Sequence, residues 1–213
     1  MNLENLKKAE ARFLQRYPNG FLDPDMVAIG KKHKMSRMIE LSQDLFRREN
    51  FARPHAVVNN LVKIISGASM VSMFEKPKFR RFAAALDLLE QELLCRGLEE
   101  QLYGDQHQGF EMMLDVLQSR KMAKWTLMSI TPAYFRPHDE VFVKPTTAKG
   151  IINELELNHL EYQPLPSWAF YSLFRDTIND LKTRVDSGLS PNNAAFTGFL
   201  MMSIGTNKMS KRQ

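Results

Sequence analysis

Cysteine is almost absent from this chain: Cys95 is the only one in 213 residues. A single thiol cannot form an internal disulfide or a zinc site built from cysteines, so both kinds of cross-link are excluded. Cys95 follows Leu93 and Leu94 in an apolar run, which predicts a buried, unreactive thiol rather than a catalytic one. A lone thiol is also compatible with a reducing compartment.

Long apolar runs are missing as well. No window approaches the ~20 apolar residues that a membrane helix needs. The segment from Met1 to Lys8 has no apolar core of the signal-peptide type. We therefore expect no membrane contact and a cytoplasmic location.

The motifs that would identify an enzyme are lacking. The sequence contains no Walker-type glycine-rich loop, no G-x-G-x-x-G, no G-x-S-x-G and no H-E-x-x-H. The densest run of metal-ligand residue types, His138-Asp139-Glu140, consists of neighbours that rarely face one metal, so an exposed loop is expected there. The sequence favours a protein that is not an enzyme, with no cofactor and no metal.

Charge of one sign is in only slight excess. With 29 basic and 24 acidic residues the formal charge is +5, which gives a mild preference for polyanions. The most basic run, Lys31 to Lys34, is followed by Arg37 and Glu40 three residues apart and by Asp44 and Arg48 four residues apart. These spacings predict a salt-bridged, solvated helix face rather than a nucleic-acid patch.

What the chain does have is proline at the start of helix-like runs, where its fixed φ is favourable. The apolar periodicity predicts helices at about 3–16, 24–49, 54–66, 77–96, 105–118, 120–130, 145–157, 167–186 and 191–203. We expect an all-α fold, a single multi-helix bundle of about eight or nine helices spanning 1–204. A flexible basic tail is expected over 205–213.

The clearest apolar stripe lies in the predicted helix 77–96. Its members recur at spacings of three and four residues: Phe79, Phe82, Leu86, Leu89 and Leu93. This pattern predicts one continuous helix with these side chains on its buried face.

Three predicted helix starts carry cations, although the helix dipole places partial positive charge there and disfavours Lys and Arg. A helix start with free N–H groups, hydroxyls and cations is suited to an anion. The alternative is that acidic side chains from elsewhere neutralise each cluster. The candidate anion-binding residues are Lys76, Lys78, Arg80 and Arg81; Arg120, Lys121 and Lys124; and Lys144, Thr146, Thr147 and Lys149, with Arg136 nearby.

The third cluster follows a loop held between two X-Pro steps, Arg136-Pro137 and Lys144-Pro145. The residue before a proline avoids the helical region, so this loop should hold its side chains at defined positions. Arg136 could grip a phosphate with both guanidinium nitrogens, with Lys144 and the adjacent threonines completing the site. The alternative is a structural connector whose prolines only direct the chain.

A resemblance appears at this segment. The chain around it resembles a family of helical bacterial proteins to which no activity is attached, and the resemblance implies a helical bacterial protein. The residues that carry it are Lys124-Trp125, Arg136-Pro137, Phe142-Val143-Lys144-Pro145-Thr146, Tyr162, Pro164, Trp168 and Tyr171.

A second resemblance, over Leu117 to Ile151, is to the helix-hairpin-helix DNA glycosylases. The chain departs from that family at two places: residues 119–123 replace the Gly-x-Gly hairpin, and Lys144 stands at about the position of the catalytic Asp. The resemblance therefore implies DNA contact without the base-excision chemistry. A winged-helix motif with its recognition helix in 146–162 is a further alternative, but prolines occupy the place of its preceding helix.

The leading hypothesis is a non-enzymatic protein that binds a phosphate-rich partner, most plausibly the backbone of DNA or RNA. The first alternative is a protein-interaction or assembly module, binding a protein partner or a second copy through a Met-rich apolar helix face. The second is an enzyme acting on a phosphate-bearing or base substrate at the 136–149 loop, with His138 or Glu140 as its titratable group.

Overall fold

The computed structural model describes residues 1–205, with side chains as far as Ser203. The regular secondary structure of this part of the chain is all helical, with no strand, which confirms the predicted all-α class. Three short 3-10 helices, Gly20–Leu22, Arg48–Ala52 and Ser187–Leu189, join the longer elements. The α-helices are α1 (Leu3–Arg16), α2 (Pro24–His33), α3 (Met35–Leu45), α4 (Pro54–Gly67), α5 (Glu75–Ala84), α6 (Leu88–Tyr103), α7 (Gln106–Ser119), α8 (Trp125–Phe135), α9 (Pro145–Glu154), α10 (Trp168–Lys182) and α11 (Asn193–Gly205).

The expected eight or nine helices are too few, because two predicted helices are each divided. The helix expected over 24–49 breaks at Lys34, which adopts the left-handed conformation (φ 54°, ψ 34°) between α2 and α3. The helix expected over 77–96 ends at Ala84, and α6 begins anew after Asp87 with a reciprocal capping box to Glu90. Leu89 and Leu93, expected on the buried face, are consequently 64% and 39% exposed.

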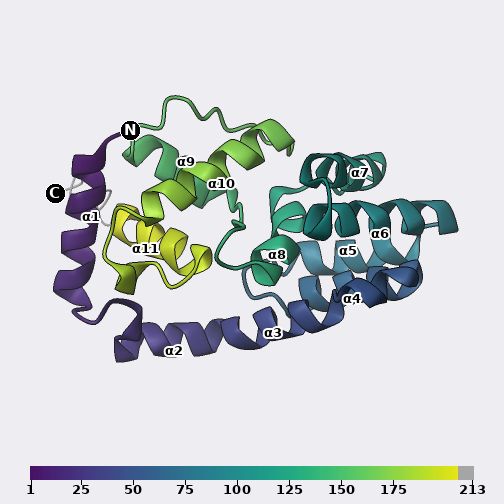
Figure 1. Ribbon diagram of the computed structural model, residues 1–213, viewed down its shortest axis with the longest axis horizontal. Coiled ribbons are helices and arrows are strands. Elements are labelled where there is room, and N and C mark those ends of the chain that lie inside the picture. Colours follow the sequence, from purple (N-terminus) through teal and green to yellow (C-terminus); the bar gives the residue numbers. More distant parts are fainter. Residues whose placement is uncertain (206–213) are drawn as a thin grey trace.

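The helices gather at two ends of the molecule (Figure 1). Helices α4 to α8 lie at one end, and α1, α9, α10 and α11 lie at the other. Helices α2 and α3 run along one side between the ends, where α3 packs on α8 and α4. At the other end α11 packs against α1, α9 and α10. The expected division into a domain at 1–204 and a tail stays a prediction, and residues 206–213 lie outside the described part.

Helix α8 is the central element. Every residue from Trp125 to Tyr134 is buried, so the helix is apolar on all sides, as expected for a helix inside the core. Its last residue, Phe135, is partly buried, and Lys124, which precedes the helix, is exposed. The extended, buried segment Val141–Val143 follows, and the backbone N–H of Val143 donates to Ser129 Oγ of α8 (2.9 Å). This bond ties the start of α9 to α8.

Helices α6 and α7 make the most extensive contact between elements of the described chain. A Cβ added at Gly109 would stand 2.3 Å from the backbone nitrogen of Gln101 and 2.5 Å from the carbonyl oxygen of Gly97. Such distances leave no space for even one methyl group, so the two backbones meet directly. The approach depends on glycine at this position.

Cys95 is buried beside α4, as the sequence predicts, and burial raises the pKa of its thiol to about 11. The thiolate fraction near pH 8 should therefore be roughly 100-fold lower in the folded chain than in the unfolded chain, whose thiol has an ordinary pKa of 9.0. We expect iodoacetamide to alkylate Cys95 rapidly in urea and very slowly in native buffer, as followed by mass spectrometry. Equal rates in the two conditions would contradict this placement.

Candidate anion-binding groove

A groove of about 740 Å³ lies where α5, α8 and α9 begin. We call it the three-helix groove. Its walls come from the chain before α5, from the first residues of the three helices and from the segment before α10. The lining residues are Ser69, Met70, Val71, Ser72, Met73, Glu75, Lys76, Lys124, Trp125, Thr126, Lys144, Pro145, Thr146, Tyr162 and Pro164.

The three helices begin without a side-chain cap, as α3 and α4 also do. Their N-cap residues are Phe74, Lys124 and Lys144, and none of the three provides a side-chain hydrogen bond to the first turn. The backbone N–H groups of a first turn have no partner within the helix, so α8 and α9 retain donors for another acceptor. At α5 the N–H groups of Glu75 and Lys76 already donate to the carbonyl oxygen of Ser72 (3.0 and 3.3 Å), so this start contributes its lysine alone. Side-chain caps are present at α1, α2, α6, α7 and α10, from Asn2, Asp23, Asp87, Asp105 and Ser167.

Three lysines come together in this groove: Lys76, Lys124 and Lys144. Within the described part of the chain none of them forms an ion pair. One carboxylate, Glu75, also lines the groove and accepts a hydrogen bond from Thr126 Oγ1 (2.9 Å). Three cations against one anion leave a net charge of +2 by count. Dipoles and side chains therefore favour a negatively charged guest here.

The second predicted cluster divides between the groove and the surface. Helix α7 continues to Ser119, and the next helix begins at Trp125 rather than at 120. The chain turns between them through Lys121, whose φ is 57°. Arg120 is held by Glu90 in a two-pronged ion pair, with Nε–Oε1 at 2.9 Å and a terminal nitrogen–Oε2 at 2.7 Å. Only Lys124 of this cluster lines the groove.

Of the other candidates, only Thr146 lines the groove. The Lys149 ammonium lies 5.4 Å from the ring centre of Tyr162. Thr147 faces a neighbouring hollow. Three further cations are exposed on α5 outside the lining: Lys78, Arg80 and Arg81.

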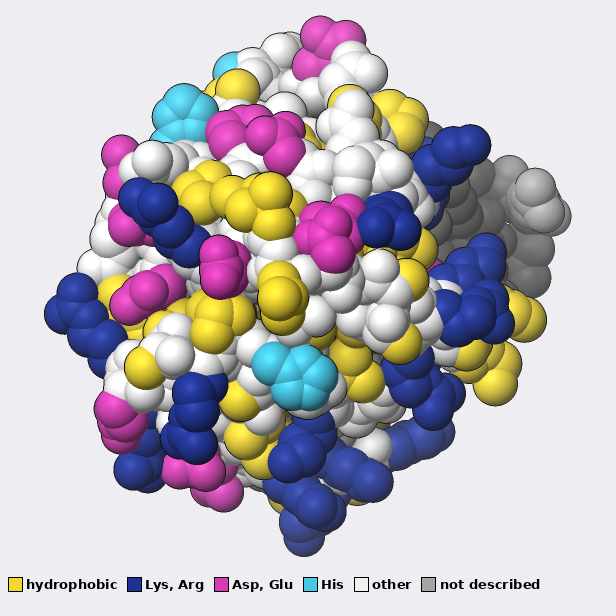
Figure 2. Space-filling model, turned by 90° about the vertical axis from the view of Figure 1, so that its right-hand side faces the viewer, with side chains coloured by type: hydrophobic (Ala, Val, Ile, Leu, Met, Phe, Trp, Pro, Cys, Tyr) yellow, Lys and Arg dark blue, Asp and Glu magenta, His cyan; other side chains and the backbone are white. Residues whose placement is uncertain are grey.

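The positive excess is unevenly spread over the surface. Figure 2 shows the face on the side of α4, α6 and α7, where Lys and Arg side chains gather toward the lower right and Asp and Glu lie mainly above and to the left. A segregated charge distribution gives a stronger local potential than the net charge of +5 would suggest.

Arg136 is not part of the three-helix groove. Its guanidinium donates to the carbonyl oxygen of Gln101 and to the Glu140 carboxylate, each at 2.9 Å. The proposed phosphate grip of Arg136 with Lys144 and Thr146 is therefore not assembled in this structure. The contacts of Arg136 are instead those of the alternative interpretation, in which this segment is a structural connector that fixes the path of the chain.

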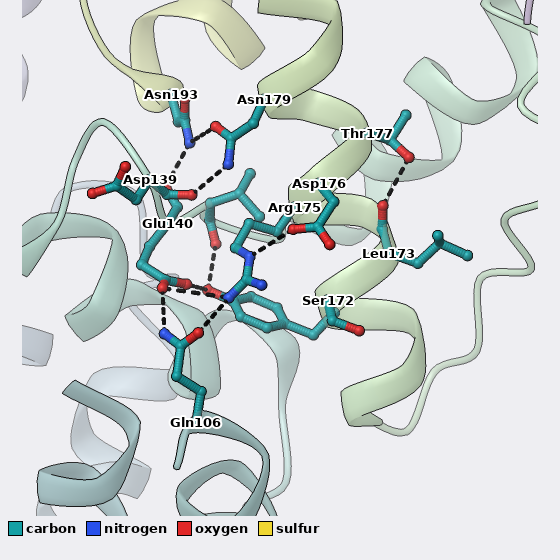
Figure 3. A network of polar contacts seen from close by, with 12 residues as sticks. Gln106, Asp139, Glu140, Ser172, Leu173, Arg175, Asp176, Thr177, Asn179 and Asn193 are labelled. Atoms are coloured by element: carbon teal, nitrogen blue, oxygen red, sulfur yellow. Dashed lines mark hydrogen bonds and ion pairs between the residues drawn. The ribbon is translucent and has the colours of Figure 1, made fainter. Parts of the chain in front are cut away.

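Glu140 lies at the centre of a buried polar network (Figure 3). It is 2% exposed, and its carboxylate accepts from Arg136, from Gln106 Nε2 (2.7 Å) and from the Tyr171 hydroxyl (2.8 Å). A terminal nitrogen of Arg175 lies 3.5 Å from the same carboxylate. Burial, and then the charge of Glu140, raise the pKa of Tyr171 well above its usual range.

This network corrects the expectation of an exposed loop at residues 138–140. His138 and Asp139 are exposed, but Glu140 turns inward because Arg136 and Arg175 compensate its charge. The partners from α7 and α10 are distant in sequence, so no local signal could have identified them. Glu140 lines neither the three-helix groove nor the hollow that Thr147 faces.

Comparison with known proteins finds no match: no family model, no curated protein and no solved structure is significantly similar to this chain. Among residues 1–205, no group of three or more His, Cys, Asp or Glu is placed to hold a metal ion. In the same part of the chain, no helix combines the length and the apolar character needed to cross a bilayer.

Proposed function

We propose that this protein binds the phosphate backbone of a nucleic acid in the three-helix groove and performs no chemistry on it. The observation that carries the proposal is the convergence of Lys76, Lys124 and Lys144 at three uncapped helix starts, with no ion pair to any described residue. Backbone N–H groups and lysines are the donors that proteins use for phosphate contacts.

A polymer suits this groove better than a single small phosphate. The three lysines come from three separate elements around a cavity of about 740 Å³, so they can meet several phosphates along one strand. Beside them Met73 and Phe74 are 74% and 75% exposed, which offers apolar surface to bases. Contacts of this kind carry little sequence information, so binding should show weak sequence preference.

The test is the salt dependence of binding, measured by fluorescence anisotropy with single-stranded and duplex oligonucleotides of mixed sequence. We expect affinity to fall steeply between about 50 and 200 mM salt, because each neutralised phosphate releases counterions. Replacing Lys76, Lys124 and Lys144 together by Ala should weaken binding to every sequence. It should also lower the single-strand salt slope by roughly 2, from three contacts at about 0.7 each.

Lys63→Ala is the matched control, because Lys63 is exposed on α4 and lines neither hollow. It removes one charge of the same type and should leave most of the salt slope in place. Affinity that does not change with salt, or a triple variant that binds like the parent chain, would refute the proposal. Inorganic polyphosphate in a parallel titration separates recognition of phosphate alone from recognition of a nucleic acid.

A further inference from the structure

A second hollow, of about 650 Å³, lies between the α2–α3 junction and α11. We call it the methionine groove, after the side chains that share its lining: Met26, Met35, Met70, Met201 and Met202. Val27, Ile29 and Met201 are 38%, 39% and 46% exposed, so apolar surface in this groove remains in contact with water. Methionine adapts its shape to an apolar guest more readily than branched side chains do.

The polar part of this groove has one sign of charge. Lys31, Lys34, Arg37 and Lys144 line it, and its lining contains no Asp or Glu. The expected ion pairs of Arg37 with Glu40 and of Asp44 with Arg48 do not form among the described residues, and Asp44 pairs with Arg47 instead (2.8 Å). The four cations of the groove have no ion pair to any described residue. Hydroxyls of Ser36, Ser69 and Thr147 stand among them.

We propose that the methionine groove binds a small amphiphilic anion, a molecule with an unbranched apolar body and a phosphate or carboxylate head. The volume lies in the range of small-molecule sites, whereas a docked protein helix needs a longer apolar track. The apolar lining matches the body, and the four cations match the head. A phosphate monoester, with more than one negative charge, suits four cations better than a carboxylate does.

This site is distinct from the proposed nucleic-acid site, although the two hollows share Ser69, Met70 and Lys144. Lys76 and Lys124 line only the three-helix groove, whereas Arg37 and Gly198 line only the methionine groove. Substitutions at these positions therefore test the two proposals separately.

Gly198 offers a direct way to block the methionine groove. It lies in the helical interior of α11, and a Cβ added there meets nothing within 4 Å. Gly198→Leu should fill the groove while favouring the helix, because Leu has a higher helix propensity than Gly. Ala11→Leu is the matched control, since it places a Leu at an exposed position of α1 outside the groove.

The experiment is calorimetric titration with dodecyl phosphate, kept below its critical micelle concentration. We expect it to bind at least about 10-fold more tightly than dodecyltrimethylammonium, which has the same chain and the opposite charge. Inorganic phosphate should bind far more weakly than dodecyl phosphate, because it has no apolar body. Dodecanoate in a further titration separates a carboxylate head from a phosphate head.

Gly198→Leu should lower the affinity for dodecyl phosphate by about 10-fold or more, and Arg37→Ala should lower it less. Ala11→Leu and Lys76→Ala should leave it unchanged, with circular dichroism confirming that each variant is folded. Equal binding of the two head-group charges, or full binding by folded Gly198→Leu, would overturn the proposal. A homodimer that Gly198→Leu dissociates in light scattering would also overturn it, because a second copy would then occupy the groove.

Discussion

Glu140→Ala should reduce the free energy of unfolding by about 2–4 kcal/mol, since it removes the buried carboxylate shared by two partly buried arginines and two neutral donors. Glu140 is 2% exposed, and its carboxylate accepts from Arg136, Gln106 and Tyr171 and lies 3.5 Å from Arg175. The lost attraction is only part of the cost. The Arg136 and Arg175 side chains are only 31% and 15% exposed, so water would replace only part of the lost partner, although Arg175 keeps its ion pair with Asp176 (3.1 Å). Urea denaturation followed by circular dichroism measures the change.

The control for this variant is Asp180→Ala, which breaks a surface pair with Arg184. A terminal nitrogen of Arg184 lies 2.9 Å from a carboxylate oxygen of Asp180, but the Arg184 and Asp180 side chains are 40% and 46% exposed. Its removal should cost about 0–1 kcal/mol, because water replaces the lost partner. If the two variants lost similar stability, Glu140 would not be buried in the manner described.

Gly109→Ala should lower the free energy of unfolding by roughly 2–3 kcal/mol, even though Ala is the better helix former. The new methyl group would lie 2.3 Å from the backbone nitrogen of Gln101 and 2.5 Å from the carbonyl oxygen of Gly97. Backbone atoms cannot rotate away as side chains do, so α6 and α7 would have to separate along their contact. Thermal and urea unfolding should both report the loss.

Gly30→Ala makes the same chemical change where there is space. A Cβ at Gly30 meets nothing within 4 Å, and the residue lies inside α2. We expect this variant to gain about 0.5–1 kcal/mol, because Ala loses less backbone entropy in a helix than Gly. A stabilising effect of both substitutions would show that α6 and α7 are not in backbone contact.

Apolar periodicity and the positions of proline predict the helical class and most helix positions. They predict the breaks between helices less well. The break before α6 has a local signal, Asp87 followed three residues later by Glu90, which is the pattern of a capping box. The apolar stripe from Phe79 to Leu93 obscures this signal, because its spacing of three and four residues continues across the break. The break at Lys34 has no such signal, since lysine rarely adopts a left-handed conformation.

The candidate site shows the same division between local and distant causes. Cations at helix starts are visible in the sequence, and Lys76, Lys124 and Lys144 all line one groove. Arg120 and Arg136 differ from these lysines because Glu90 and Glu140 form ion pairs with them. Those pairs exist only in the folded chain. Sequence pattern therefore identified where positive charge stands on helices, and tertiary packing decided which charges remain unpaired.

Helix α1 depends on parts of the chain that are made much later. The backbone N–H of Asn2 donates to the carbonyl oxygen of Leu155 (2.7 Å), and Asn5 Nδ2 bonds the carbonyl oxygen of Glu154, 149 residues further on. At a synthesis rate of about 5–20 residues per second, this distance corresponds to roughly 7–30 s. During that interval the apolar side of α1, with Leu6 and Phe13, has no partner from α9 or α11. Helix α1 thus leaves the ribosome well before α9 and α11 do, and it can dock only when those helices arrive.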